Sequence, residues 1–561
     1  MLKHASKHTQ TRCPQFKETS KMTEKELLKL GYFPKELPPP FESKTFSDKI
    51  DTIKTQWNSV SSLFRKPERL KYSDSKWVVF SIPKVQLSRR IINIPNPLHQ
   101  SKLTSTIADR WTEIDEIFKK SNISSSLPIE DTKKNRALIP KHDFSTFKRR
   151  RLNESFANLY EVKTDVSRFY GTIYTHSIPW LVHTKSIAKA NRTDMTLLGN
   201  ALDKDLRNLN SGQTVGIPIG PDTSLVIAEI MTCLMDEQIQ TKLKNVKSFR
   251  FIDDYYLYCD SYADAEKAFK FIQSLLTEYQ LDINEEKTKI SKAPFAFDSR
   301  WSIELGSFTF RKRANSQLTD IERFVSLSLI HSNENPKDSV LLFSIQVLKY
   351  LQLFDENWDT YESLILKIGI TEPRTLPVVT EILASNISRI SKRKTKNIIE
   401  KLIDIHLPKG HNYEVAWALW MCVEFNIKLK NKMAERIFAS NDYVSILIAL
   451  DLKSKGRINA TVSTDGLLTE LNEESLMNEN WLFTYESIKK GWLTPTDNPI
   501  DKNKYFEILL ANGIYFYKED AKVKTFTVKK PTEVISETTK KPETEVATTI
   551  VSGGGSGGSS Y

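Results

Sequence analysis

Two adjacent acids interrupt an otherwise apolar and aromatic run in Phe251-Ile252-Asp253-Asp254-Tyr255-Tyr256-Leu257-Tyr258. Residues 249–259 have the composition of two short strands. A tight turn between these strands would place both carboxylates at its tip. Burying two like charges in a hydrophobic hairpin is costly unless a cation compensates for them. The run therefore suggests a hairpin whose tip faces an ion.

A third acid stands in a similar setting. Asp165 ends the strand-like segment 160–164. Two strands that end in carboxylates suit phosphoryl transfer, because Mg²⁺ prefers hard oxygen ligands. Two such ions about 3.5–4 Å apart can activate an attacking hydroxyl and stabilise a leaving phosphate oxygen. Ordinary turn aspartates would give the same residues, so the three acids alone leave both interpretations open.

Two neighbouring segments favour the functional interpretation. Gly216, Pro218 and Gly220 punctuate a loop that leads into a helix expected over 223–240, and glycine lets a flat backbone approach a base or sugar. After a second amphipathic helix, expected over 263–279, Lys287 presents a cation where a departing pyrophosphate could need one. Strands and helices thus alternate, which predicts an α+β region.

The motifs follow in the order Asp-bearing strand, Gly-Pro-Gly loop, Asp-Asp hairpin and Asn-x-x-Lys. This order resembles the palm of reverse transcriptases over about residues 75–310, and 251–254 match the family's (Tyr/Phe)-x-Asp-Asp. The resemblance implies two Mg²⁺ or Mn²⁺ ions, and RNA-directed DNA synthesis from dNTPs. It assigns the catalytic residues as Asp165, Asp253, Asp254 and Lys287, and the metal site as Asp165, Val166, Asp253 and Asp254.

The same resemblance implies a nucleotide site. Tyr170 would exclude a ribose 2′-OH, and the other nucleotide-binding candidates are Phe169, Arg136, Gly216, Pro218 and Gly220. The basic run 148–151 is a candidate for template phosphates, although such a run is also typical of a solvated face. Many family members carry Gln where this loop has Ile219, which weakens the expectation of ordinary processive, template-faithful copying.

Two further segments resemble one branch of the family. Residues 167–180 and 216–229 look like bacterial abortive-infection and defence-associated reverse transcriptases, although Gly171-Thr172 stands where that group has Pro-Ser. This resemblance implies antiphage defence, a noncoding RNA template or scaffold, a DNA product, a protein hydroxyl primer and a homo-oligomer, trimeric or hexameric. A retron-like RNA-primed enzyme and a catalytically idle RNA-binding scaffold remain alternatives.

Composition divides the chain into four parts. Residues 1–74 hold a polar arm, expected to be mobile to about residue 25, and a Pro-rich strap at 30–41 that aromatic residues can pin to a surface. Residues 75–315 would form right-hand polymerase fingers and palm. Residues 316–520 are expected to form an all-α, HEAT-like domain. Residues 521–561, rich in Thr, Lys, Glu and Pro and then in Gly and Ser, would be disordered.

The Gly/Ser-rich end could serve as a flexible arm. About 40 residues of coil have a root-mean-square reach of roughly 35 Å. Such an arm could carry the hydroxyl of Tyr561, the candidate primer, into a polymerase cleft. The segment 553–559 is equally typical of an artificial linker, and the composition does not separate these two interpretations.

Charge and cysteine usage fit this reading. The 561 residues carry a formal net charge of +12, which is compatible with a nucleic-acid partner and also with a merely basic protein. The four cysteines are scattered without CxxC spacing, so we expect neither a zinc site nor disulfides, and a cytoplasmic location. No stretch approaches the ~18 apolar residues of a membrane span, so no membrane partner is expected.

Overall fold

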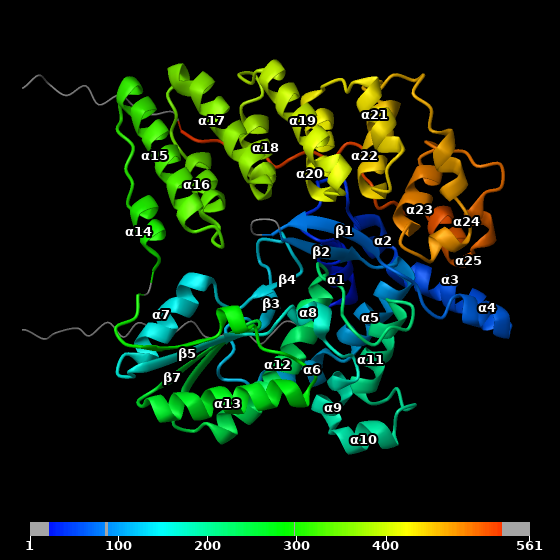
Figure 1. Ribbon diagram of the computed structural model, residues 1–561. Helices are drawn as coiled ribbons and strands as arrows, with labels where there is room; N and C mark the ends of the chain where they lie inside the picture. The colour runs from blue at the N-terminus through cyan, green and yellow to red at the C-terminus, as the bar shows by residue number, and fades with distance from the viewer. Residues whose placement is uncertain (1–21, 85–87, 297, 530–561) are drawn as a thin grey trace, which may run out of the picture.

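The computed structural model describes residues 22–84, 88–296 and 298–529, and Figure 1 shows it as a mixed α/β part below a row of helices. The central sheet of the lower part has the strand order β6-β7-β5-β8. Its members are β5 (Tyr160–Asp165), β6 (Lys247–Phe251), β7 (Asp254–Cys259) and β8 (Lys289–Lys292). All three pairings are antiparallel, and the register sets Asp165 opposite Asp254.

The two faces of this sheet pack against different helices, because successive side chains of a strand point to opposite sides. On one face, Val162 and Leu257 are fully buried with residues of α13 (Tyr262–Glu278). On the other face, Tyr256 and Tyr258 pack with Phe147 of α7 (Phe144–Ser155). The aromatic side chains of the hairpin are thus packed in two hydrophobic cores, and its turn is the part left available for a functional site.

The expected elements of the lower part are present. Helix α12 (Asp222–Lys242) and α13 match the two predicted helices within a few residues, and β6 and β7 form the predicted hairpin. The remaining helices of this part are α5 (Pro97–Asp109), α6 (Trp111–Phe118), α8 (Phe169–Thr172), α9 (Ser177–His183), α10 (Lys185–Ala190) and α11 (Leu198–Asn208).

Two further hairpins lie between this palm and the helical row. Strands β1 (Val78–Pro83) and β2 (Arg89–Ile94) pair antiparallel, as do β3 (Pro128–Glu130) and β4 (Leu138–Pro140). The β1–β2 hairpin is held to the row by its Arg89, whose two terminal nitrogens lie 2.5 and 2.9 Å from the carboxylate oxygens of Glu414. The assignment of this hairpin to polymerase fingers stays a prediction.

The N-terminal part differs from the expected mobile arm up to about residue 25. Helix α1 (Glu24–Gly31) begins at a Thr23 cap, and Met22 and Leu27 are buried. Three more helices follow, α2 (Lys44–Asp48), α3 (Ile50–Leu63) and α4 (Lys66–Lys71). The polar sequence concealed these helices, because α1, α2 and α3 each bury only two or three residues and α4 buries none. Residues 1–21 lie outside the described residues.

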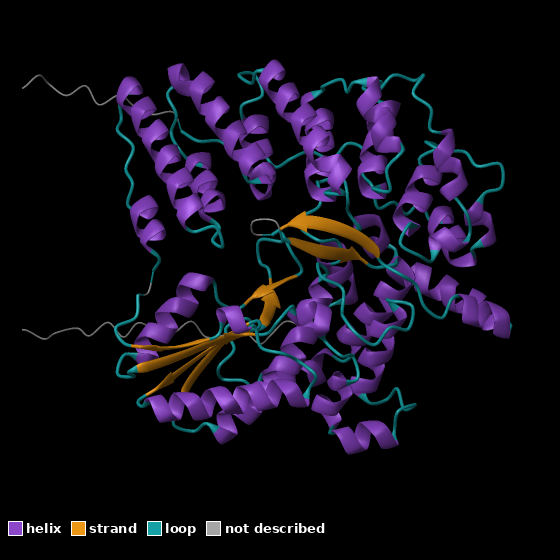
Figure 2. Ribbon diagram, viewed as in Figure 1, coloured by secondary structure: helices purple, strands orange, loops and turns teal. Residues whose placement is uncertain are grey.

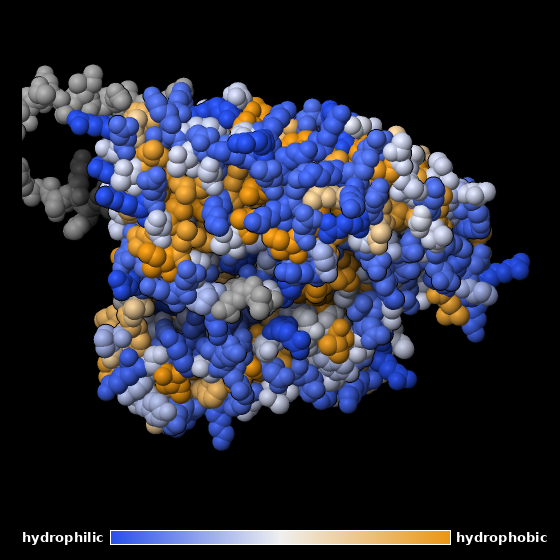
Figure 3. Space-filling model, turned by 45° about the horizontal axis from the view of Figure 1, so that its top comes forward, coloured by the Kyte–Doolittle hydropathy of each residue, from blue (hydrophilic) through white to orange (hydrophobic). Residues whose placement is uncertain are grey.

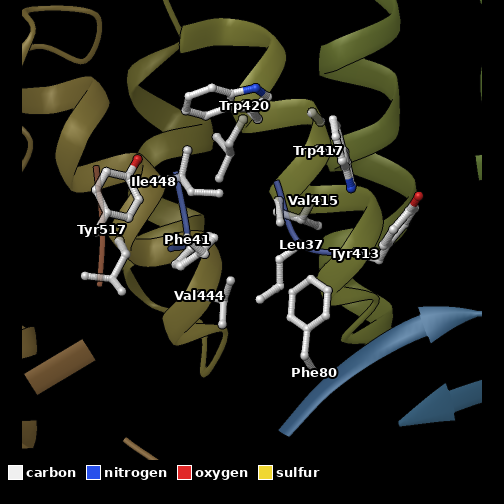
Figure 4. Packing of buried hydrophobic residues seen from close by; sticks show 14 of the residues in the cluster. Leu37, Phe41, Phe80, Tyr413, Val415, Trp417, Trp420, Val444, Ile448 and Tyr517 are labelled. Carbon is white, nitrogen blue, oxygen red and sulfur yellow. The ribbon is translucent and has the colours of Figure 1, made fainter. Parts of the chain in front are cut away.

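The strap at 30–41 is packed, as its aromatic residues predict. Tyr32 is fully buried and donates a hydrogen bond to the Pro95 carbonyl at 2.6 Å. Leu37 and Phe41 are inserted beside Trp417 and Val444 of the helical row, as Figure 4 shows. The indole nitrogen of Trp417 donates to the Glu36 carbonyl at 3.0 Å. The strap therefore joins the palm to the helical row.

The described residues of 316–520 contain helices and no strand (Figure 2). The helices after the palm are α14 (Arg300–Gly306), α15 (Ala314–Glu334), α16 (Val340–Lys349), α17 (Trp358–Thr371), α18 (Leu376–Ser385), α19 (Lys392–His406), α20 (Asn412–Phe425), α21 (Asn431–Phe438), α22 (Tyr443–Ser454), α23 (Trp481–Lys489), α24 (Pro499–Lys502) and α25 (Lys504–Ala511). Figure 1 shows α15 to α22 side by side, and the apolar helices α20 and α22 form the centre of their core.

The chain after α25 contradicts the expectation of disorder from residue 521. Ala521 and Val523 are buried, and the Val523 amide donates to a Glu424 carboxylate oxygen at 3.2 Å. The Phe526 amide donates to Ser385 Oγ at 3.0 Å. Alternating apolar residues let this polar segment lie along the helices as an extended strap. Residues 530–561 lie outside the described part.

The surface in Figure 3 is mostly hydrophilic, and a depression runs between the helical row and the palm. None of the helices in the described part of the chain is long and apolar enough to cross a bilayer.

Glu486 of α23 generates a prediction about stability. It is buried, one carboxylate oxygen accepts from the Phe516 amide at 2.6 Å, and burial raises its pKa to about 7. An acid with a raised folded-state pKa loses stability as pH rises from its unfolded to its folded pKa. We expect the free energy of unfolding to fall by up to about 3 kcal/mol from this group between about pH 4.5 and 7.

Glu486→Gln keeps the acceptor and removes the titration, so its urea-unfolding free energy should decline less between pH 5 and pH 8 than that of the wild type. Glu507→Gln, at an exposed position of α25, is the control. Equal declines in the wild type and Glu486→Gln would contradict the assignment.

Candidate active site

Three carboxylates converge where β5 ends and the β6–β7 hairpin turns. The ligand oxygens of Asp165, Asp253 and Asp254 all lie within 4.8 Å of one another. The turn reverses at Ile252, whose φ of 57° is in the left-handed region. The short turn thus leaves both hairpin acids beside the end of β5. The sequence-based expectation that the three acids form one cluster is met by this geometry.

The electrostatics of the cluster call for added positive charge. Burial and the neighbouring charges of Asp165 and Asp254 raise the pKa of Asp253 to about 7. Burial and Asp165 also raise the pKa of Asp254, while Lys287 opposes that shift. Like charges at this spacing disfavour ionisation. A divalent cation with oxygen ligands would relieve the repulsion, and the donor set suits Mg²⁺ or Mn²⁺.

Lys287 and Asn284 hold the first aspartate. Lys287 Nζ lies 2.6 Å from Asp165 Oδ2, and Asn284 Nδ2 donates to the same oxygen at 3.1 Å. The Asn284 amide also donates to the Asp165 carbonyl at 2.7 Å. The Asn-x-x-Lys motif is therefore placed beside the triad as the sequence predicts. In this structure Lys287 pairs with Asp165, and the predicted contact with pyrophosphate would require it to change partner.

A buried arginine fixes the turn that carries Asp253. Arg250 of β6 is fully buried, and its Nη1 donates to the Ile252 carbonyl at 2.8 Å. The same guanidinium is bidentate to Glu229 of α12, at 2.9 and 3.0 Å. It also contacts Asp236 of α12, at 2.7 to 3.0 Å. All five of its N–H donors can therefore be used.

Serine hydroxyls complete this network. Ser124 and Ser126 donate to Glu229 at 2.9 and 2.7 Å, and Ser121 donates to Asp236 at 2.6 Å. Ser126 Oγ also accepts from the Ile252 amide at 2.7 Å. Both backbone groups of Ile252 are thereby anchored. Sequence reasoning missed Arg250, and the available signal was a charged residue placed between two aromatic ones, Phe249 and Phe251.

The residues after Asp165 line the near side of the site. Val166 is buried and forms an isolated β-bridge with Ile283. Because its side chain is apolar, only its main-chain carbonyl could bind a metal. Phe169 is buried in the palm core, and Tyr170 packs against its ring at 5.6 Å between centroids. Burial and the charge of Asp253 raise the pKa of Tyr170. Tyr170 thus lies close to the acids, whereas Phe169 is buried in the core and packs against the Tyr170 ring.

The Gly-Pro-Gly loop has two different roles in the fold. Gly216 has φ 87°, and its amide donates to the Ile173 carbonyl at 2.8 Å. At Gly220, with φ 129°, a Cβ atom would lie 2.4 Å from Pro34 of the strap. The Pro218 carbonyl accepts from Ser224. The close approach that Gly220 permits is therefore to the strap, and the sequence-based expectation of a base or sugar there is not what the structure shows.

Arg136 does not point to a triphosphate. Its Nε donates to Asp222 at 3.0 Å, Nη1 to the Phe33 carbonyl at 2.6 Å and Nη2 to the Gly220 carbonyl at 2.9 Å. Its side chain is 16% exposed. The charge of Arg136 is used to fasten the strap to the start of α12. Its assignment as a nucleotide-binding residue stays a prediction, and these contacts give it no support.

The basic run 148–151 is interpreted either as a contact for template phosphates or as a solvated face, and its residues differ in their surroundings. Lys148 pairs with Asp298 at 2.5 Å, and Arg150 donates to the Asn122 carbonyl at 2.5 Å. Arg151 lies over the Tyr256 ring at 3.8 Å, and Arg149 is exposed. Three of these cations therefore have structural contacts. The candidate primer Tyr561 lies outside the described residues.

The acids at the ends of β5 and of the β6–β7 hairpin, with the aromatic Tyr170 beside them, define a nucleotidyltransferase palm. Residues 82–303 match the family model described as reverse transcriptase (RNA-dependent DNA polymerase). This match supports RNA-directed DNA polymerase activity, a nucleotidyl transfer, for this part of the chain.

Among solved structures the chain is similar to yeast telomerases. Apo telomerase from Candida tropicalis has 13% identity and a TM-score of 0.30, over 71% of this chain and 72% of that chain. Telomerase from Candida albicans, in complex with a fragment of telomeric RNA, has 13% identity and a TM-score of 0.27, over 71% and 69%.

A third similar structure, telomerase from Candida tropicalis truncated from its C-terminal domain, has 15% identity and a TM-score of 0.29. The match covers 40% of this chain and spans about half, 51%, of that one. No curated protein matches the chain.

The Arg250 network generates a prediction. Arg250→Met leaves Glu229 and Asp236 buried without their cation, which typically costs about 3–5 kcal/mol. We expect a markedly lower melting temperature, measured by differential scanning calorimetry. Arg300→Met, which breaks an ion pair made by an arginine whose side chain is 84% exposed, should leave the melting temperature nearly unchanged.

The triple variant Arg250→Met, Glu229→Leu, Asp236→Leu removes all three charges together and should recover much of the lost stability. Because it no longer anchors Ile252, its DNA synthesis should stay low. Full activity in the refolded triple variant would exclude a positioning role for Arg250.

Proposed function

We propose that this chain synthesises DNA from dNTPs by two-metal nucleotidyl transfer, as a reverse transcriptase of antiphage defence. The observation that supports this most is the convergence of Asp165, Asp253 and Asp254 within 4.8 Å. Two bound Mg²⁺ or Mn²⁺ ions would activate the attacking hydroxyl and stabilise the leaving oxygen. The donor set fits such ions, because the acids repel one another in their absence.

The protein's own groups have separable roles in this proposal. Asp165, Asp253 and Asp254, together with the main chain of Val166, hold the metal site. Lys287, already 2.6 Å from Asp165, neutralises charge near the triad and could turn to a departing pyrophosphate. Tyr170, next to the acids, is placed to pack under the sugar and exclude a 2′-OH.

The defence role is supported by the resemblance of residues 167–180 and 216–229 to abortive-infection reverse transcriptases. We further propose a noncoding RNA as template or scaffold, a homo-oligomer, and a cytoplasmic location. The +12 net charge complements a polyanionic RNA and DNA partner. The buried, unpaired Cys233, Cys259 and Cys422 are compatible with a reducing compartment.

Priming is proposed to use a protein hydroxyl, with Tyr561 as the candidate. Residue 529 is the last described position, and the 32 residues 530–561 that follow it end with Tyr561. A flexible segment of that length has a root-mean-square reach of roughly 30 Å. Tethering would raise the local hydroxyl concentration at the active site without a binding pocket.

Asp253→Asn tests the polymerase site. Loss of one charged ligand should reduce deoxynucleotide incorporation by about 100-fold or more, measured with labelled dNTPs on the full-length protein. Asp260→Asn, at an exposed acid just after β7, is the matched control and should retain activity. Unchanged phage defence in Asp253→Asn would instead favour an RNA-binding scaffold.

Tyr561→Phe tests the primer. Mass spectrometry of nuclease-treated wild-type protein should find a nucleotide adduct on the peptide that ends at Tyr561, and the variant should lack it. An adduct on another residue would exclude Tyr561. DNA released free of peptide would indicate a retron-like, RNA-primed enzyme.

A further inference from the structure

Outside the palm, a second group of potential metal ligands lies at the turn from α19 to α20. The Nδ1 atoms of His406 and His411 are 2.9 Å apart. Glu414 Oε1 lies 3.8 Å from the first and 3.9 Å from the second. The three donor atoms therefore converge on one point, and only this group and the catalytic triad do so among the described residues.

The two imidazoles cannot both present a bare lone pair at this distance without repulsion. Either one Nδ1 carries a proton and donates it to the other, or a cation lies between them. Burial lowers the pKa of both histidines, which favours the neutral, ligating form of each ring. Glu414 Oε1 is nearly equidistant from the two Nδ1 atoms. A single hydrogen bond between the rings does not require this symmetry, whereas a cation bound by all three atoms does.

Small movements would convert this arrangement into a tetrahedral site. With Zn–N bonds of about 2.0–2.1 Å, two ligand nitrogens lie about 3.3 Å apart. The His406–His411 separation would open from 2.9 Å, and Glu414 Oε1 would close from 3.8–3.9 Å. His411 also lines a cavity of about 260 Å³ together with Asn412 and Asp442, which gives an ion a route to the site and room for a water ligand.

Glu414 connects this group to the fingers. The carboxylate is 2% exposed and receives both terminal nitrogens of Arg89 from β2. A carboxylate that bridges an arginine and a metal has its single negative charge compensated by both cations, and such outer hydrogen bonds orient metal ligands. An ion here would stiffen the α19–α20 turn and, through Glu414, its attachment to the β1–β2 hairpin.

We propose that His406, His411 and Glu414 form a binding site for a zinc-class divalent cation. The bound ion would strengthen the connection between the helical row and the fingers. The site binds one ion through two Nδ1 atoms and one carboxylate oxygen, with water as a fourth ligand. This role is structural and separate from the Mg²⁺ chemistry of the palm, because imidazole nitrogens suit zinc-class ions, whereas magnesium takes oxygen ligands.

The test uses full-length protein stripped with a chelator. Isothermal titration with Zn²⁺, and Co²⁺ titration followed by visible absorption, should show one equivalent that raises the melting temperature. The double variant His406→Asn, His411→Asn should bind at least about tenfold more weakly. Asparagine places an amide where Nδ1 stands, so it can preserve a hydrogen bond while losing the imidazole ligand.

Two controls localise the binding. His176→Asn alters a histidine that pairs with Asp203 at 3.0 Å elsewhere in the palm, and Asp254→Asn alters the catalytic triad. Both should retain the zinc equivalent. Absence of saturable Zn²⁺ binding in the wild type, or equal affinity in the wild type and the double variant, would overturn the proposal and leave a hydrogen-bonded histidine pair.

Discussion

The hydrogen bond from Arg250 to the Ile252 carbonyl is the contact on which the catalytic geometry depends. Two adjacent acids at a hairpin tip repel each other and Asp165, so the turn would relax outward unless something held it. Arg250 holds it from within the protein, and Glu229 and Asp236 of α12 hold Arg250. The long buried helix thus sets the position of the turn through one guanidinium.

The palm is joined to the helical row by the two terminal straps. Neither terminal strap forms a domain of its own, yet Phe41 and Tyr517 pair as an isolated antiparallel bridge inside the core of the row. Arg136 then fastens the N-terminal strap to Asp222, the first residue of α12. Helix α12 is therefore braced at its start by the strap and along its length by Arg250. The active site and the helical row share this support.

Local pattern was sufficient for the elements that carry the chemistry. The aromatic run with Asp253 and Asp254, the strand ending in Asp165, and both long palm helices were predicted because their periodicity lies within single segments. The partners of Arg136 and Gly220 were not predictable in this way, since Asp222 and Pro34 are remote in sequence. Arg250 escaped for a similar reason, because an arginine in a strand ordinarily indicates an exposed face.

The departure at Ile219 can now be given a physical reason. Its amide donates to Asn93 Oδ1 at 3.0 Å, and its carbonyl accepts from the Asn93 amide at 2.8 Å. Its side chain packs partly buried against the core shared with the strap and helical row. A glutamine there would replace that partly buried apolar contact with an amide. The main chain at this position therefore locks the loop to β2 whatever the side chain, and the isoleucine adds apolar contact with the core.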